Sequence, residues 1–292
     1  SNYGAAVMSW STATASRTPS ASSWQTKQAR MFKPRSEFLE TVLRWTPAQA
    51  VMQQRRRGLL AVITYHAIHD GERFDDHLDA LEEMGSFVSL EDVVANASDG
   101  RPLPSRPILV TFDDGDPSVL HTAAPRLYAR GIPAVMFLIT DLIGTDHVLW
   151  TTEVVQLVAS GGRTTLDPTC DGRALARVLK QSPDPVRRQV IEELRDTASG
   201  PRPRARQLSA PEIAGLTQLG MAISSHTMSH PCLAQCTNDV IDREIAGSRE
   251  VLADLVGQPP LALAYPNGNH DARSRRAVSR AGYAVAFGFD HR

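Results

Sequence analysis

Two adjacent carboxylates, Asp113 and Asp114, are the residues of this sequence best placed to do chemistry. They come directly after the apolar and β-branched run 108–112, and Gly115 follows them. In a continuous strand, neighbouring side chains point to opposite faces, but a glycine directly after the pair can let both carboxylates reach one cavity. One carboxylate could then bind a metal ion while the other transfers protons.

Two histidines, His226 and His230, form the second candidate group. Their spacing places both imidazoles on one face of a helical turn, where they can reach one ion. With Asp114 they would form a His-His-carboxylate set that leaves positions for water and substrate, which suits catalytic zinc and also ferrous iron. The alternative is structural, with His226 capping a helix and His230 packing beside Pro231. The acidic turn favours the metal site.

The residues around the histidines exclude one class of enzyme. A zinc protease of the His-Glu type needs glutamate directly after its first histidine, and here that position is Thr227. Cys232 and Cys236 lie close enough to be considered as ligands. Cysteines at such positions are more often small buried residues, so we expect neither thiol to bind the metal.

Alternating strand and helix patterns must position these side chains. Buried strands are expected at 59–68, 108–112, 133–140, 221–225, 261–265 and 283–289, with helices between them. About seven strands alternating with helices predict an α/β fold, either a parallel barrel or an open parallel sheet. Active sites in both folds lie at the carboxyl ends of the strands, where the acidic turn and the histidines fall.

Two segments interrupt or precede this alternation. Residues 1–57 are expected to form a leader with one short helix around Phe38, Val42 and Trp45, and residues 58–292 the catalytic domain. Within that domain, residues 141–207 have a helical pattern and end in a Pro-Arg-Pro-Arg stretch, which predicts a helical insertion. The insertion could form a wall or lid over the site.

The composition is that of an ordinary globular protein. The 292 residues are 42% hydrophobic and 22% charged, and the net charge of −1 provides no basic field for nucleic acid. No apolar window is long enough for a membrane span. Three cysteines do not make a disulfide framework, which favours a cytoplasmic location, although a removed export signal is compatible with the sequence.

Three motifs in order carry a resemblance to a known family. Thr111–Gly115, Ser225–Pro231 and Ala264–Gly268 resemble the leading motifs of the polysaccharide deacetylases, also called the NodB-homology family or family 4 carbohydrate esterases. The resemblance runs from about Leu59 to the end, apart from the insertion. It implies a distorted parallel (β/α) barrel of the NodB type and hydrolysis of an N-acetyl group on an amino sugar. It also implies a divalent metal, usually zinc, with cobalt, nickel or iron as alternatives.

The resemblance also implies roles for individual residues. Asp113 matches the catalytic base, and the family's metal ligands match Asp114, His226 and His230. In the third motif, Tyr265, Pro266 and Asn267 match the substrate-side segment, and the backbone N–H after the proline, here that of Asn267, would hold the oxyanion.

Departures from the family pattern resemble those of one branch of the family. Ala264 stands where many members have an arginine that orients the base, and the late Leu-x-His motif that supplies the general acid is missing. The tyrosine before the proline resembles the branch of biofilm poly-N-acetylglucosamine deacetylases, whose acid histidine comes from an early Tyr-His segment. His66 fits that position. The alternatives are that His66 is a buried strand residue and that His291 is the acid.

Three functions remain open from the sequence. The first is a metal-dependent hydrolase that removes an N-acetyl group from an amino-sugar or saccharide substrate. The second keeps the fold and the metal but hydrolyses a small non-sugar amide or cyclic imide. The third is an inactive saccharide-binding barrel, which would have no need of a base beside three ligands.

Overall fold

One parallel sheet forms the centre of the molecule. The computed structural model describes residues 6–9, 59–166 and 171–288; the expected helix around Phe38 and Trp45, and His291, lie outside this range. The strands are β1 (Ala6–Ser9), β2 (Ala61–Tyr65), β3 (Ser86–Phe87), β4 (Pro107–Phe112), β5 (Ala134–Leu138), β6 (Met221–Ser225), β7 (Ala262–Ala264) and β8 (Val285–Gly288).

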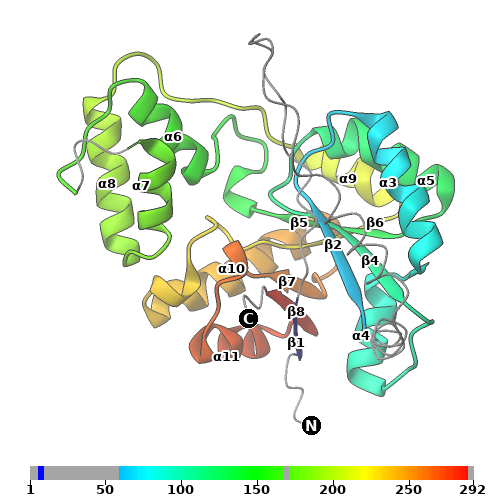
Figure 1. The fold of residues 1–292 in the computed structure, drawn as a ribbon. Helices are drawn as coiled ribbons and strands as arrows, with labels where there is room; N and C mark the ends of the chain where they lie inside the picture. Colours follow the sequence, from blue (N-terminus) through cyan, green and yellow to red (C-terminus); the bar gives the residue numbers. More distant parts are fainter. Residues whose placement is uncertain (1–5, 10–58, 167–170, 289–292) are drawn as a thin grey trace, which may run out of the picture.

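The strand order is that of a curled sheet with two edges. It runs β1-β8-β7-β6-β5-β4-β2, with β3 added to β4, and every pairing is parallel. Among the described strands no pairing joins β1 to β2, so the sheet is a half-barrel (Figure 1). The expected distorted parallel barrel is confirmed. The pairing of β1 with β8 was not expected, because β1 lies in the segment interpreted as a leader.

Both faces of the sheet are buried, which explains the continuous apolar runs in the sequence. In β5, Ala134, Met136 and Leu138 belong to the core between the sheet and its outer helices, whereas Val135 and Phe137 belong to the core on the other face. There the rings of Phe137 and Phe287 meet edge to face, with centroids 5.6 Å apart.

Helices pack around the sheet, as expected from the alternation of strands and helices. They are α3 (Gly71–Met84), α4 (Leu90–Asp99), α5 (Ala124–Arg130), α9 (Ala210–Gln218), α10 (Asn238–Val256) and α11 (Ala272–Ala281). Capping boxes are present at Ser89 and Ser209, with Asp92 and Glu212 as their partners. A short π-helical segment (Val119–Ala123) precedes α5.

Three helices form a separate group in the stretch where an insertion was expected. These helices, α6 (Trp150–Ala159), α7 (Gly172–Leu179) and α8 (Asp184–Thr197), have a hydrophobic core of their own (Figure 1). Gly172 allows α7 to approach α6 closely, because a Cβ there would lie 2.6 Å from the Cα of Val155. Cys232, which follows the histidine motif, packs into this same core. The insertion therefore contacts the part of the chain that carries the histidines.

None of the helices in the described ranges combines the length and the apolar character needed to cross a bilayer.

Candidate active site

The acidic turn begins at the end of β4. The backbone N–H of Asp113 donates to the carbonyl of Tyr65 (2.9 Å), which continues the pairing of β4 with β2. Asp114 and Gly115 then both adopt left-handed conformations, with φ of 69° and 87°. The reversal that brings both carboxylates to one place thus starts at Asp114 itself, one residue before the glycine. Aspartate is among the few residues that tolerate this conformation.

The segment that carries the two histidines is not a helical turn, so the geometry expected from their spacing is wrong. β6 ends at Ser225, and Thr227 and His230 are left-handed, with φ of 68° and 57°. The backbone is therefore irregular at these two residues. The imidazoles still converge, with ring centroids 4.7 Å apart. His226 does not cap a helix, since its Nδ1 bonds the carbonyl of Ala264 (2.8 Å).

The two imidazoles and one carboxylate meet around a common point. Nε2 of His226 lies 3.6 Å from Oδ1 of Asp114, and Nε2 of His230 lies 3.7 Å from the same oxygen. One ligand atom from each of these residues lies within 4.8 Å of the others. Zinc bond lengths of about 2.0–2.1 Å at a tetrahedral angle separate two ligand atoms by about 3.4 Å, close to these distances. The residues therefore fit a divalent metal ion.

The protonation states of the three residues also suit a divalent metal ion. Because an imidazole hydrogen bond to a carbonyl requires a ring N–H, His226 carries its proton on Nδ1, which leaves the Nε2 lone pair for a metal. Burial lowers the pKa of His226 and lowers that of His230 to about 3, so both rings are neutral near pH 7. Burial by itself raises the pKa of Asp114, but proximity to His230 and His226 outweighs it and the pKa is lowered. Neutral imidazoles and an ionised carboxylate are the forms that bind metal.

Asp113 is in a different environment from Asp114. It is 4% exposed, its Oδ1 has no hydrogen-bond partner in the described structure, and its Oδ2 lies 4.0 Å from Nε2 of His226. Burial, and secondly the charge of Asp114, raise the pKa of Asp113 well above its ordinary value. When the environments of two neighbouring carboxyl groups move their pKa values apart, the two groups typically take different roles in catalysis.

His66 reaches the same place from the neighbouring strand. It follows β2 directly, its side chain is 62% exposed, and its Nε2 lies 3.9 Å from Oδ2 of Asp114. The alternative that His66 is a buried strand residue is therefore wrong.

The third motif borders the histidines through its backbone. The carbonyl of Ala264, at the end of β7, accepts the hydrogen bond from His226. Tyr265 is buried, its ring stacks on His270 (4.9 Å between centroids), and burial raises the pKa of its hydroxyl, which has no hydrogen-bond partner in the described structure. Asn267 is left-handed (φ 54°), and its Nδ2 points at Sγ of Cys232 (3.6 Å).

The two cysteines remain outside the ligand group. Both are buried, and burial raises the pKa of Cys232 and raises that of Cys236 to about 12. Thiols in this state are poor metal ligands, because a metal binds the thiolate. The group of possible ligands in the described residues contains neither thiol.

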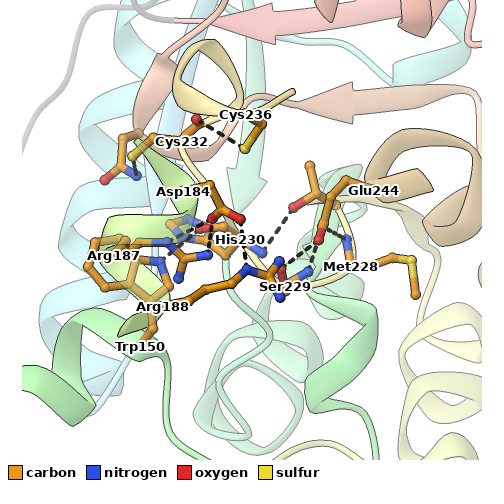
Figure 2. Close-up of polar contacts among 12 residues, drawn as sticks. Trp150, Asp184, Arg187, Arg188, Met228, Ser229, His230, Cys232, Cys236 and Glu244 are labelled. Atoms are coloured by element: carbon orange, nitrogen blue, oxygen red, sulfur yellow. Dashed lines mark hydrogen bonds and ion pairs between the residues drawn. The ribbon is translucent and has the colours of Figure 1, made fainter. Parts of the chain in front are cut away.

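Two buried residues that the sequence did not single out hold the histidine segment in place (Figure 2). Glu244 of α10 accepts hydrogen bonds from the N–H of Met228 (3.0 Å), the N–H of Ser229 (2.8 Å) and the Ser229 hydroxyl (2.6 Å). Trp150 of the insertion donates from Nε1 to the carbonyl of His230 (2.9 Å). The sequence contained a signal for Glu244, because a charged residue on the apolar face of α10 needs a buried partner. No pattern in the sequence pointed to Trp150.

Comparison with known proteins agrees with this geometry. The polysaccharide deacetylase family profile matches residues 100–286. The chain belongs to the polysaccharide deacetylase family. Membership supports deacetylation of a saccharide as the activity. A Bacillus subtilis (strain 168) protein described as "Putative polysaccharide deacetylase YxkH" is 21% identical over 267 residues, which cover 88% of this chain and 74% of that protein.

Solved structures of deacetylases share the fold. The Streptococcus pyogenes deacetylase PplD, in complex with acetate, has a TM-score of 0.54 at 20% identity and covers 78% of this chain and 83% of its own. IcaB from Ammonifex degensii has a TM-score of 0.55 at 20% identity, with 80% and 84% covered. At this identity the likeness concerns the fold.

Proposed function

We propose that this protein is a metal-dependent N-deacetylase that removes the acetyl group from an amino sugar within a saccharide. The observation that carries the proposal is the convergence of Asp114, His226 and His230 at distances that fit one ion, next to the separate carboxylate of Asp113. These three residues would hold the metal, with zinc as the first choice and cobalt, nickel or iron as alternatives. When bound, such an ion activates water and polarises the amide carbonyl.

Asp113 is the proposed general base. Its carboxylate lies beside the ligand group without being part of it, and it would take the proton of the attacking water. Its burial favours this role, because a raised pKa brings a carboxyl group closer to the pH at which it must accept and release protons. Oδ1 of Asp113 has no donor in the described structure, and position 264, where many family members have an arginine that orients the base, is alanine.

His66 is the proposed general acid. Amide hydrolysis expels an amine, so a group must protonate the nitrogen as the intermediate collapses. The exposed ring of His66 reaches the mouth of the site, within 3.9 Å of Asp114, and is free to contact a substrate from the solvent side. The segment Tyr265–Asn267 is the proposed oxyanion and substrate side, supported by the contact of its neighbour Ala264 with His226.

Acetate release from N-acetylated chito-oligosaccharides tests this function. Activity should disappear on treatment with a chelator and return with zinc or cobalt, and the Asp113→Asn variant should bind cobalt but release no acetate. Activity that is indifferent to chelation would contradict the metal-dependent mechanism. Hydrolysis of small N-acetyl compounds but not of oligosaccharides would assign the same site to a small amide, and a metal-free, inactive protein that binds glycans would be a saccharide-binding barrel.

A further inference from the structure

The two histidines of the site are held in different ways. Nδ1 of His226 is bonded to the carbonyl of Ala264, as is usual for a histidine that binds a metal through its other nitrogen. Nδ1 of His230 is buried and has no hydrogen-bond partner in the described structure. The orientation of the His230 ring must therefore be set through its backbone.

That backbone is strained. His230 has φ of 57°, a conformation that costs a residue with a side chain of order 1 kcal/mol or more and persists only where the surroundings impose it. Two hydrogen bonds impose it here. The N–H of His230 donates to Oγ1 of Thr227 (3.1 Å), and its carbonyl accepts from Nε1 of Trp150 (2.9 Å). The first bond is local, whereas the second comes from the insertion.

Trp150 is fixed by a buried ion pair on the facing helix. Arg187 lies with its guanidinium carbon 5.0 Å from the centroid of the Trp150 ring, and its Nε and Nη2 both donate to Oδ1 of Asp184 (3.1 and 2.5 Å). Arg188 donates to the other carboxylate oxygen of Asp184 (2.7 Å). Figure 2 shows the stack of Arg187 on Trp150 against the histidine segment. A buried ion pair contributes little net stability, because desolvation offsets its attraction, so an orienting role explains its presence better.

The histidine segment is thus held from two sides. On the barrel side, Glu244 binds Met228 and Ser229. On the insertion side, Trp150 binds the carbonyl of His230, and Cys232 packs into the core of the insertion. His230 lies between the two attachments.

We propose that Trp150, oriented by Arg187, is a positioning residue for His230, so that the helical insertion completes the metal site. This inference rests on the proposed metal site. It gives the insertion a role in metal affinity in addition to any contact with substrate.

Cobalt binding to the full chain tests this role without relying on activity. Trp150→Phe keeps an aromatic ring for Arg187 but removes the Nε1–H donor. Loss of an indirect partner of a metal ligand costs about tenfold or more in metal affinity, so we expect the Kd for Co²⁺ to rise about tenfold. The visible absorption of the bound cobalt should also shift, because the His230 ring is no longer held in one orientation.

Leu194→Ala is the matched control. Leu194 is fully buried in the core of the insertion but lies two turns along α8 from Arg187. This variant should lower the melting temperature at least as much as Trp150→Phe while leaving the cobalt affinity and spectrum of the wild type unchanged. Arg187→Lys, which keeps the charge beside Asp184 but removes the planar stack, should shift the spectrum in the same direction as Trp150→Phe.

Three outcomes would overturn the inference. The first is a Trp150→Phe variant with the cobalt affinity and spectrum of the wild type. The second is a Leu194→Ala variant that loses as much cobalt affinity as Trp150→Phe, which would show that metal binding depends only on the stability of the insertion. Both leave the proposed function intact. The third is a wild-type protein that binds no cobalt, in which case the proposed function fails as well.

Discussion

Replacement of Glu244 by glutamine should loosen the histidine segment while leaving the shape of the core unchanged. Glu244 is 3% exposed and receives three hydrogen bonds, two from the backbone N–H groups of Met228 and Ser229 and one from the Ser229 hydroxyl. In Glu244→Gln one carboxylate oxygen becomes a donor and the charge is lost.

The magnitude follows from the nature of these bonds. Hydrogen bonds to a charged group contribute about 1.5–3 kcal/mol each, and neutral ones about 0.5–1.5 kcal/mol. The glutamine oxygen can keep the two backbone donors, and the Ser229 hydroxyl can rotate to accept from the new amide. Three bonds that each weaken by about 1 kcal/mol give a loss of about 3 kcal/mol of unfolding free energy, or roughly 6–12 °C in melting temperature for a domain of this size.

Urea unfolding and cobalt titration measure the two consequences. Because Ser229 directly precedes His230, we expect the variant to lose metal affinity as well as stability. Glu250→Gln is the control, since Glu250 is exposed on the same helix and its replacement should change the unfolding free energy by less than about 0.5 kcal/mol. Our assignment of Glu244 to the histidine segment would be refuted by equal stabilities of the two variants. It would also be refuted by a destabilised Glu244→Gln protein with wild-type cobalt affinity.

The other predictions concern the proposed catalytic residues and the fold. Asp113→Asn should retain cobalt and lose roughly a hundredfold or more in turnover of chito-oligosaccharides, whereas Asp114→Asn should lose the metal; the opposite pattern would reverse the two roles. His66→Ala should bind cobalt normally and slow amide hydrolysis far more than hydrolysis of an activated aryl ester, and equal losses would assign His66 to binding or packing. Glu212→Gln should destabilise the protein at pH 7, because hydrogen bonds from Ser209 lower the pKa of Glu212 from 4.5 to about 2. The stabilisation that comes from this lowered pKa is fully present above about pH 4.5 and is lost towards pH 2. The difference in unfolding free energy between the wild type and the variant, measured with urea, should therefore shrink between pH 4.5 and pH 2. A difference that stays constant would contradict this prediction. Gly172→Ala should lower the melting temperature, because its Cβ would lie 2.6 Å from the backbone of α6, and an unchanged value would show that α7 can move away.

Local patterns in the sequence were sufficient for the alternation of parallel strands and helices and for the residues of the candidate site, whereas the barrel form was implied by the resemblance of three motifs to the polysaccharide deacetylases. The apolar run 108–112 predicted a parallel strand, because a strand covered on both faces has no polar side, and the observed strand is Pro107–Phe112. The helix starts at Ser89 and Ser209 are also readable locally, because a capping box involves residues only three apart. The paired carboxylates and the paired histidines indicated a metal site by their chemistry alone.

The arrangement of that site was decided only by the tertiary structure. The spacing of His226 and His230 suggested a helical turn, but left-handed residues at 227 and 230 bring the rings together instead. That backbone is maintained by contacts from elsewhere, since Trp150 is separated from His230 by 80 residues in the sequence and Glu244 from Ser229 by 15. Sequence periodicity reports which face of an element is buried, but not which distant residue it meets there. A hydrogen bond between distant segments leaves no such pattern, so only the folded chain shows how these candidate ligands are oriented.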